Sequence, residues 1–234
     1  MILRQLFDQQ SSTYTYIVAD NDTRQACIID PVKEKIEHYL QLFEELDIQL
    51  KYALDTHIHA DHITALGTLN ERTGCQAVVG SEGDVACATD SLHDEKQLNI
   101  GNLTIRILFT PGHTSDSYCF FLNQQNRSYL FSGDTLLIRG TGRTDFQNGD
   151  PNELYNSIHN KIMALPADTI VLPGHDYKGW TSSTLAEEKK HNPRLQLDKE
   201  AFITHMNNLN LPDPKMMDIA VPANLACGKN ETSQ

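Results

Sequence analysis

The sequence predicts an α+β fold with two β-sheets and helices on the outside. Runs typical of strands outnumber the helical patterns, and the helical patterns fall between groups of strands. These two observations favour two sheets with helical cover. The length of 234 residues allows one large domain or a domain with an appendage.

Eight short segments predict strands. Each is an apolar run or alternates between apolar and polar residues, as strands do. In chain order they are residues 14–20, 26–30, 51–57, 76–80, 103–110, 118–122, 128–134 and 169–175.

Three helices are expected among these strands. The first covers residues 31–46, where apolar side chains recur at helical spacing on one face. The second covers residues 63–74 and ends at Gly74, which suits a helix terminus. The third covers residues 150–165 and starts at an Asp-Pro pair, a common helix opening.

The pattern changes from about Thr181. Residues 181–195 predict a capped helix stopped by an Asn-Pro pair, and a short helix follows at residues 198–209. Residues 210–228 are rich in proline and predict an irregular tail. We therefore expect a main domain of residues 1–180 and a C-terminal extension, residues 181–234, packed on the same domain.

Composition and charge exclude several function classes. The 19 basic and 31 acidic side chains give a formal net charge of −12, and no basic cluster stands out, so a nucleic-acid partner is not expected. No apolar run approaches the roughly 20 residues that span a bilayer, so no membrane partner is expected either. The N-terminus lacks the features of a signal or transit peptide, which predicts a cytoplasmic protein.

The five cysteines give a prediction about redox state. They are Cys27, Cys75, Cys87, Cys119 and Cys227. Their number is odd and no pair has CxxC spacing, so we expect reduced, mostly buried thiols and no disulfide framework.

Four blocks share one pattern, an apolar run that ends in histidine or aspartate. They are "ALDTHIHADH", "LFTPGHT", "YLFSGDT" and "IVLPGHD". Loops at strand ends present functional groups on a rigid scaffold, and imidazole and carboxylate groups suit zinc, iron or manganese. The sequence therefore predicts a metal site built from His57, His59, Asp61, His62, His113, Asp134 and His175.

The remaining polar residues of this type have simpler interpretations. Isolated histidines are more often structural or exposed than ligands, which is the interpretation we give to His38, His93, His159, His191 and His205. Asp55 has two possible roles that the sequence does not separate: it orients a ligand histidine, or it simply ends its strand.

These motifs resemble those of a known superfamily. "THIHADH" followed by "GHT", "SGD" and "GH" resembles the metallo-β-lactamase superfamily, which implies an αββα sandwich with a metal site at one edge. "GRTDF", "NPRL" and the surrounding blocks resemble the persulfide dioxygenases of the mitochondrial and bacterial type, over about residues 14–228. The sequence departs from the usual pattern at Asp116 and Ala65, where glycine is common in related proteins.

Counting residues alone favours two metals. His57, His59 and His113 could hold one metal and Asp61, His62 and His175 the other, with Asp134 between them. This is the arrangement of hydrolytic relatives such as glyoxalase II, which cleave hydroxyacylglutathione thioesters, and zinc would suit that alternative.

The resemblance to persulfide dioxygenases implies one Fe(II) per chain instead. Its ligands would be His57, His113 and Asp134, a two-histidine, one-carboxylate set with open positions. The other four motif residues, His59, Asp61, His62 and His175, would then surround the ligands. The implied reaction oxidises glutathione persulfide with O2 to sulfite and releases glutathione; zinc could replace iron in a given sample.

An acidic enzyme needs local cations to bind the two carboxylates of glutathione. Arg143 in "GTGRTDF" and Arg194 in "NPRL" are the candidates, and Tyr177 could offer a hydroxyl group. The alternative for Arg143 is a salt bridge with Asp145 that stabilises the loop. A non-catalytic metal-binding or sulfur-carrier module is a third class of function, and the resemblance is also compatible with a homodimer.

Overall fold

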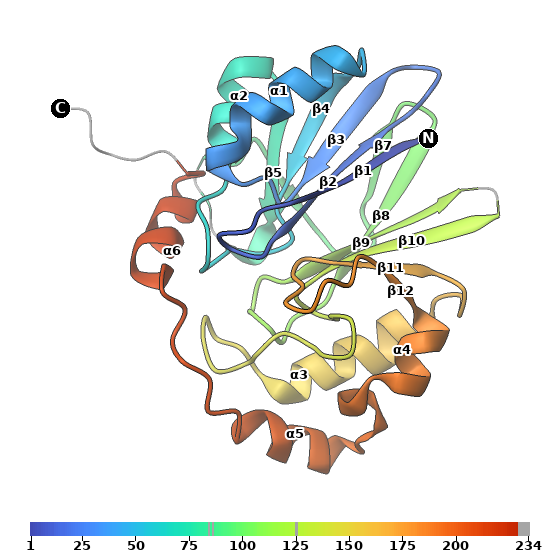
Figure 1. Ribbon diagram of the computed structural model, residues 1–234, viewed down its shortest axis with the longest axis vertical. Coiled ribbons are helices and arrows are strands. Elements are labelled where there is room, and N and C mark those ends of the chain that lie inside the picture. The colour runs from blue at the N-terminus through green and yellow to red at the C-terminus, as the bar shows by residue number, and fades with distance from the viewer. Residues whose placement is uncertain (84, 86, 125, 229–234) are drawn as a thin grey trace. The chain divides into compact units, whose positions relative to one another are not determined.

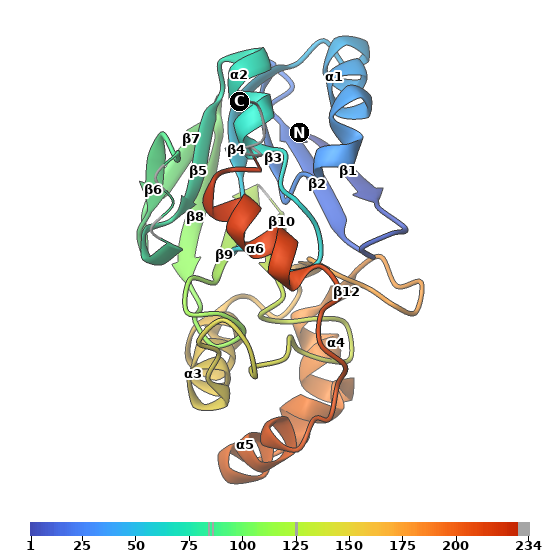
Figure 2. The same ribbon diagram turned by 90° about the vertical axis from the view of Figure 1, so that its left-hand side faces the viewer.

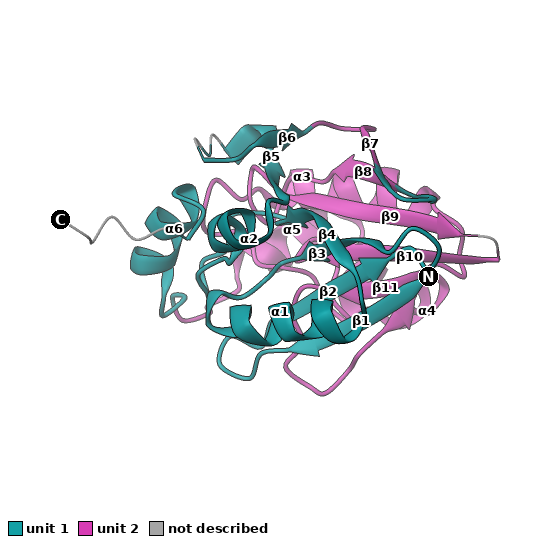
Figure 3. Ribbon diagram, turned by 90° about the horizontal axis from the view of Figure 1, so that it is seen from above, with its two compact units in different colours: residues 1–92, 99–104, 213–234 teal, residues 93–98, 105–212 magenta. Residues whose placement is uncertain are grey.

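A computed structural model describes residues 1–83, 85, 87–124 and 126–228 of the chain. It contains two six-stranded sheets. The chain divides into two compact units, coloured separately in Figure 3. Unit 1 comprises residues 1–92, 99–104 and 213–234, and unit 2 comprises residues 93–98 and 105–212.

The first sheet belongs to unit 1 and has the strand order β1-β2-β3-β4-β5-β6. Strands β1 to β3 pair antiparallel, and β3 to β6 pair parallel. The carboxyl ends of β3 and β4 therefore lie side by side at one edge of the sheet. The strands are β1 (Ile2–Phe7), β2 (Tyr14–Ala19), β3 (Gln25–Ile29), β4 (Gln49–Leu54), β5 (Gln76–Gly80) and β6 (Asp90–Leu92).

Helices α1 (Ile36–Glu45) and α2 (Leu66–Thr73) cover one face of this sheet (Figures 1 and 2). Alternate side chains of β2, Ile17 and Ala19, face the same apolar cluster as Phe43 of α1. Helix α2 ends at Gly74, whose φ of 73° is the left-handed conformation that glycine adopts without strain.

The second sheet has the order β12-β11-β10-β9-β8-β7. Strands β8, β9 and β10 pair antiparallel, β10 pairs parallel with β11, and β11 pairs antiparallel with β12. The carboxyl ends of β8, β10 and β11 therefore share one edge. The strands are β7 (Gln97–Ile100), β8 (Leu103–Phe109), β9 (Tyr118–Gln124), β10 (Arg127–Gly133), β11 (Ile170–Pro173) and β12 (Ser183–Thr184).

Unit 2 has its own helical layer, made of α3 (Pro151–Asn156), α4 (Leu185–His191) and α5 (Lys199–Asn207). Leu154 of α3 and Phe202 of α5 are fully buried in one cluster with side chains of β10 and β11. Each sheet is thus covered by helices that bury apolar side chains against it, which confirms the predicted α+β class.

All eight predicted strands are present, and four strands were missed. Three of these, β6, β7 and β12, have between two and four residues, too few for a periodic pattern to show. The fourth, β1, is an edge strand that carries Arg4 and Gln5 in its middle.

The predicted helices are present with shorter bounds. Asp150 caps α3 by accepting hydrogen bonds from the backbone N–H groups of Asn152 and Glu153, as its Asp-Pro opening predicts. The chain then continues through a wider helical turn at Ser157–Lys161. Among the residues that the structure describes, no helix is both long and apolar enough to cross a bilayer.

The prediction of an irregular tail at residues 210–228 is wrong in part, because Met217–Leu225 form helix α6. Pro222, one of the prolines on which that prediction rested, lies inside this helix, where it removes one intrahelical hydrogen bond. Residues 181–212 belong to unit 2 and α6 belongs to unit 1. The domain boundary expected at residue 180 stays a prediction. Residues 229–234 of the expected extension lie outside the described chain.

The cysteine prediction is wrong for two of the five residues. Cys87 and Cys227 form a disulfide within unit 1, across a sequence separation of 140 residues. Sequence spacing gives no sign of such a pairing, because the fold alone brings these residues together. Cys27, Cys75 and Cys119 are free and buried as expected, and burial raises the pKa of the Cys27 thiol to about 12.

Candidate metal and substrate site

In unit 1, the candidate ligands lie where the parallel strands β3 and β4 end. Asp30 directly follows β3, and residues 55–65, which we call the histidine loop, connect β4 to α2. The backbone N–H of Asp30 donates to the carbonyl oxygen of Leu54 at 2.8 Å, which fixes the start of the histidine loop beside Asp30.

Asp30 orients the histidine loop, and sequence reasoning missed it. Its carboxylate accepts hydrogen bonds from the backbone N–H of Thr56 at 2.7 Å and from the Thr56 hydroxyl at 3.0 Å. It also lies 3.2 Å from Nε2 of His59. Burial lowers the pKa of His59, but the hydrogen bond to Asp30 and the charges of Asp30, Asp55 and Asp61 together outweigh it and raise the pKa to about 9. The sequence does contain the pattern that could have identified Asp30, because "ACIID" is another apolar run that ends in aspartate.

The histidine loop brings several candidate ligands close together. The ring centroids of His57 and His59 are 4.2 Å apart, and those of His59 and His62 are 4.3 Å apart. One ligand atom from each of His59, Asp61 and His62 lies within 4.8 Å of the others. Nδ1 of His59 is buried and makes no hydrogen bond with the described residues. A cation that displaced a proton from His59 would give this nitrogen a partner.

Asp55 has a structural role in the same loop. Its carboxylate accepts a hydrogen bond from the Thr64 hydroxyl at 3.1 Å, which ties the start of the histidine loop to its end. Ala65, one of the two departures from the family pattern, has a φ of −88°, so this position does not require glycine.

In unit 2, three predicted residues follow three strands that end at the same edge. His113 follows β8, Asp134 follows β10 and His175 follows β11. Nε2 of His113 lies 3.6 Å from Oδ2 of Asp134, and Nδ1 of His175 lies 2.6 Å from Oδ1 of Asp134. The first distance suits two ligand atoms that share one ion with bonds of about 2.1 Å.

The tautomer of His113 follows from its second ring nitrogen. Nδ1 of His113 lies 2.7 Å from the carbonyl oxygen of Arg143, which can only accept, so Nδ1 carries the hydrogen and Nε2 presents its lone pair. Gly142 permits this approach, because a Cβ atom there would lie 2.7 Å from His113 Nδ1. "GTGR" is therefore a turn that holds the His113 ring.

Asp116, the other departure from the family pattern, does not disturb the loop that carries His113. It is buried and is not among the non-glycine residues with positive φ. The loop is closed by Ser117, whose hydroxyl accepts from the backbone N–H of Thr114 at 3.1 Å. No left-handed residue is needed at this position.

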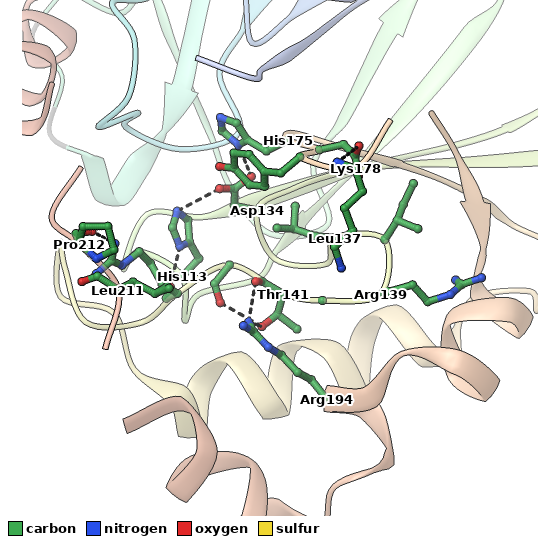
Figure 4. Close-up of a pocket in the computed structure, with 16 residues that line it drawn as sticks. His113, Asp134, Leu137, Arg139, Thr141, His175, Lys178, Arg194, Leu211 and Pro212 are labelled. Carbon is green, nitrogen blue, oxygen red and sulfur yellow. Dashed lines mark hydrogen bonds and ion pairs between the residues drawn. The ribbon is translucent and has the colours of Figure 1, made fainter. Parts of the chain in front are cut away.

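A cavity of about 540 Å³ in unit 2 opens beside these residues (Figure 4). This volume is in the range of small-molecule sites. Six of the ten predicted site residues line the cavity: His113, Asp134, Arg143, His175, Tyr177 and Arg194.

Two of the four cations that line the cavity are neutralised by carboxylates. Arg143 forms a two-pronged pair with Asp145, at 2.6 and 2.7 Å, and donates to the carbonyl oxygen of Pro212 at 2.8 Å. Arg139 pairs with Glu187 and Glu188 on α4. The structure thus contains the salt bridge that was the alternative interpretation of Arg143.

The other two cations are available for an anion. Arg194 donates to the carbonyl oxygen and the hydroxyl of Thr141, at 2.7 and 2.8 Å, and both acceptors are neutral. Burial lowers the pKa of this guanidinium, and no carboxylate among the described residues offsets that cost. The Lys178 side chain extends into the cavity, and its ammonium has no ion pair within the described chain (Figure 4).

The turn after β11 presents Lys178 and Tyr177. The carboxylate of Asp176 accepts hydrogen bonds from the backbone N–H groups of Lys178 and Trp180, both at 2.8 Å. The ring of Tyr177 is parallel to that of His175 at a centroid distance of 6.1 Å, and Tyr177 is 72% exposed. Sequence reasoning missed Lys178, although it lies directly beside the predicted Tyr177.

Helix α4 and the residues after it hold the cavity loop, residues 137–143. Glu188 is fully buried and accepts hydrogen bonds from the backbone N–H of Arg139 at 2.8 Å and from the Ser183 hydroxyl at 2.6 Å. Asn192 donates to the carbonyl oxygen of Gly140 at 2.9 Å. The "EEKKHNPRL" block therefore shapes the cavity wall.

Comparison with known proteins shows the family. Residues 10–175 match the model of the metallo-beta-lactamase superfamily. The chain is 47% identical to the mitochondrial persulfide dioxygenase ETHE1 of Mus musculus, over 97% of this chain and 89% of that protein. The crystal structure of ETHE1 from Myxococcus xanthus is 51% identical, with a TM-score of 0.94 over 98% of this chain and 100% of that one.

A hydrolytic relative is more distant. A probable hydroxyacylglutathione hydrolase of Schizosaccharomyces pombe is 33% identical over 84% of this chain and 73% of that protein. The comparisons therefore confirm the metallo-β-lactamase type of fold and favour the dioxygenase branch over the hydrolase branch. The chain belongs to the metallo-beta-lactamase superfamily and, within it, to the persulfide dioxygenase family.

Proposed function

We propose that this chain is a persulfide dioxygenase that oxidises glutathione persulfide with O2 at one non-haem Fe(II). The observation that carries the proposal is the high identity to persulfide dioxygenases over nearly the whole chain. Glutathione and iron go beyond the names of these relatives, and their support comes from the residues below.

The proposed iron ligands are His57 of unit 1 and His113 and Asp134 of unit 2. Two imidazoles and one carboxylate form the set that non-haem iron(II) oxygenases use, and they leave coordination positions open. When bound, iron(II) supplies a centre that can hold O2 and a persulfide sulfur together. The donor geometry of His113 and Asp134 fits such an ion.

The neighbouring residues prepare these ligands. The hydrogen bond between Nδ1 of His175 and Oδ1 of Asp134 holds the carboxylate so that Oδ2 faces His113. The carbonyl of Arg143 holds the His113 ring with Nε2 as the donor atom. In this proposal His175 orients a ligand, and His59, Asp61 and His62 lie around the site as hydrogen-bonding groups.

The two available cations suit the two carboxylates of glutathione. Lys178 and Arg194 line the cavity that also contains His113 and Asp134, so a bound glutathione could direct its sulfur toward the proposed iron. An ammonium binds a carboxylate as a point charge, whereas a guanidinium can bind both oxygens. Tyr177 stays a proposed hydroxyl donor.

The overall reaction balances without another cofactor. One glutathione persulfide, one O2 and one water give one glutathione, one sulfite and two protons. The terminal sulfur is oxidised, O2 is reduced, and the bond between the two sulfur atoms breaks.

The second candidate is a two-metal thioester hydrolase, and the group formed by His59, Asp61 and His62 favours it. The lower identity to the hydrolase than to the dioxygenases weighs against it. We therefore rank the dioxygenase first.

A comparison of two substrates tests the proposal. Protein loaded anaerobically with Fe(II) is given either glutathione persulfide with O2 or a hydroxyacylglutathione thioester, and the same is done with Zn(II)-loaded protein. We expect sulfite only from the iron-loaded protein with the persulfide, and no rapid thioester hydrolysis from either. Rapid thioester hydrolysis without sulfite formation would instead support the hydrolase.

A further inference from the structure

Asn224 on α6 holds the histidine loop by its backbone. Its side-chain Nδ2 donates to the carbonyl oxygens of His59 at 2.8 Å and His62 at 2.9 Å. Its Oδ1 accepts from the backbone N–H of Thr64 at 2.8 Å. Asn224 is buried, and both amide hydrogens are used on this one loop.

The chain after Asn224 closes onto the same region. The backbone N–H of Gly67 donates to the carbonyl oxygen of Cys227 at 3.0 Å, and Lys33 donates to the carbonyl oxygen of Gly228. Gly228 has a φ of 72°, and a Cβ atom there would overlap the carbonyl oxygen of Thr64. Residues 224–228, which we call the C-terminal brace, therefore fit against the histidine loop at several points.

A disulfide fixes the far end of this brace. Cys227 is bonded to Cys87, which follows β5, so the brace is tied to a second part of unit 1. Cys227 is 1% exposed, whereas Cys87 is half-buried. A small thiol can therefore reach the bond from the Cys87 side.

We propose that Asn224 is a positioning residue for the histidine loop and that the Cys87–Cys227 disulfide makes its hold sensitive to thiols. The link to metal binding rests on the proposed function, because the histidine loop carries His57. The link between the disulfide and the order of the loop does not depend on any metal.

The redox step is an ordinary thiol–disulfide exchange with a low-molecular-weight thiol as the reductant. One thiolate attacks Sγ of Cys87, which forms a mixed disulfide and releases the Cys227 thiolate. A second thiolate attacks the sulfur of the bound small thiol, releases its oxidised dimer and leaves Cys87 reduced. Two electrons pass to the protein, and two protons end on the cysteines. The product of the proposed reaction, glutathione, is itself such a thiol.

The expected consequence is a looser histidine loop. Without the disulfide, only non-covalent contacts keep Asn224 on the carbonyls of His59 and His62. Groups that orient metal ligands typically change metal affinity by about 10–100-fold when they are removed. A weaker hold by Asn224 therefore speeds metal release.

Hydrogen exchange on metal-free wild-type protein tests the redox part directly. Titration of the denatured, unreduced protein should give three free thiols, and five after reduction. After reduction we expect faster exchange of the amides of residues 59–66, including Thr64 N–H, and unchanged exchange in the strands of unit 2. Five free thiols even after treatment with oxidised glutathione, or unchanged exchange of the loop, would overturn the proposal.

The asparagine part is tested by substitution. Asn224→Ala and Asn224→Asp both remove the two donated hydrogen bonds, and Asn224→Asp keeps an acceptor for Thr64. We expect a chelator to remove iron from both variants about tenfold faster than from wild type. Asn70→Ala is the matched control, because Asn70 also donates from Nδ2 to a backbone carbonyl of unit 1, that of Cys75, at 2.6 Å.

The outcomes separate this inference from the proposed function. Equal iron release from the Asn224 variants and from Asn70→Ala would show that Asn224 is an ordinary structural residue. Faster release and faster exchange in a protein that makes no sulfite would support the brace and contradict the dioxygenase. If Asn224→Ala does not fold, Asn224→Asp and the reduced wild-type protein provide the same comparison.

Discussion

At the scale of single residues, the proposed chemistry depends on hydrogen bonds that fix which atom faces the metal. His113 presents Nε2 because its Nδ1 is held by a carbonyl oxygen. Asp134 presents Oδ2 because its Oδ1 is held by His175. Substitution of either proposed ligand, His113 or Asp134, should therefore lower the amount of bound metal first, and the loss of activity follows from that.

Asp134→Ala should lose most of the bound iron, because it removes the only carboxylate of the proposed ligand set. Metal analysis after anaerobic loading and desalting measures this loss. Asp168→Ala, which changes an exposed aspartate of unit 2, should keep its iron. Full occupancy in Asp134→Ala would show that the ligand assignment is wrong.

Lys178→Met should raise KM for glutathione persulfide about tenfold, since one ion pair with a carboxylate is worth roughly 1–2 kcal/mol in a cavity. Its kcat and iron content should stay near those of wild type, because the proposal assigns Lys178 to substrate binding and not to the ligand set. Steady-state kinetics and metal analysis give the two values. Lys190→Met, on the exposed side of α4, is the control, and an equal KM in both variants would remove Lys178 from the substrate site.

Sequence singled out the histidines and aspartates at strand ends more readily than the cations that line the cavity, for a physical reason. Histidine and aspartate at strand ends are rare enough to stand out, as in "THIHADH". Whether a surface cation is neutralised depends on its folded neighbours, so Arg143 drew attention although Asp145 pairs with it, while Lys178 was overlooked.

At the scale of elements, α4 sets the shape of the cavity loop. Arg139 lies between two glutamates of this helix, one fully buried and one half-exposed. These two adjacent glutamates provide a matched pair of substitutions, because both pair with Arg139 but only Glu188 is buried and accepts further hydrogen bonds.

Glu188→Ala should lower the free energy of unfolding by about 3 kcal/mol or more, because it removes the buried carboxylate that accepts hydrogen bonds from Arg139, Ser183 and Asn192. Glu187→Ala should lower it by less than about 1 kcal/mol, since that carboxylate is largely hydrated. Denaturant unfolding of both variants measures the difference. Equal losses would contradict the role given to Glu188.

Asp145→Asn tests the salt bridge in the loop after β10. The hydrogen bonds from Arg143 hold the pKa of Asp145 below its usual range, outweighing the effect of burial. A lowered pKa stabilises the fold above about pH 4, where the unfolded carboxyl group is ionised, and this stabilisation disappears as the pH falls through the lowered pKa.

The unfolding free energy of Asp145→Asn should therefore lie below that of wild type at neutral pH, by at most about 1 kcal/mol because the pair is partly exposed. The gap should close as the pH falls below about 4. Denaturant unfolding at several pH values shows this, with Asp168→Asn as the control. A gap that is independent of pH would mean that the ion pair does not contribute.

The elements with a clear period were predictable, and those stabilised by tertiary contacts were not. Residues 31–46 show helical spacing and contain α1. Helix α6 contains Pro222 and was predicted as irregular, but contacts such as those of Asn224 hold it in place. The Cys87–Cys227 disulfide was missed for the same reason.

At the scale of the whole molecule, both units present polar residues at strand ends. Unit 1 supplies Asp30 and the histidine loop, and unit 2 supplies His113, Asp134, His175 and the cavity. The proposed ligands, His57, His113 and Asp134, lie far apart in the sequence, so no short segment of the chain supplies all three. The cytoplasmic location and the homodimer stay predictions.

The most direct test of the central claim is the dependence of O2 uptake on iron content. Metal-free protein is titrated anaerobically with Fe(II), and O2 uptake and sulfite formation are measured after glutathione persulfide is added. The proposal predicts one sulfite per O2 and a rate that rises to one iron per chain and then stays constant. No uptake at full iron loading, or a rate that requires two metals per chain, would contradict it.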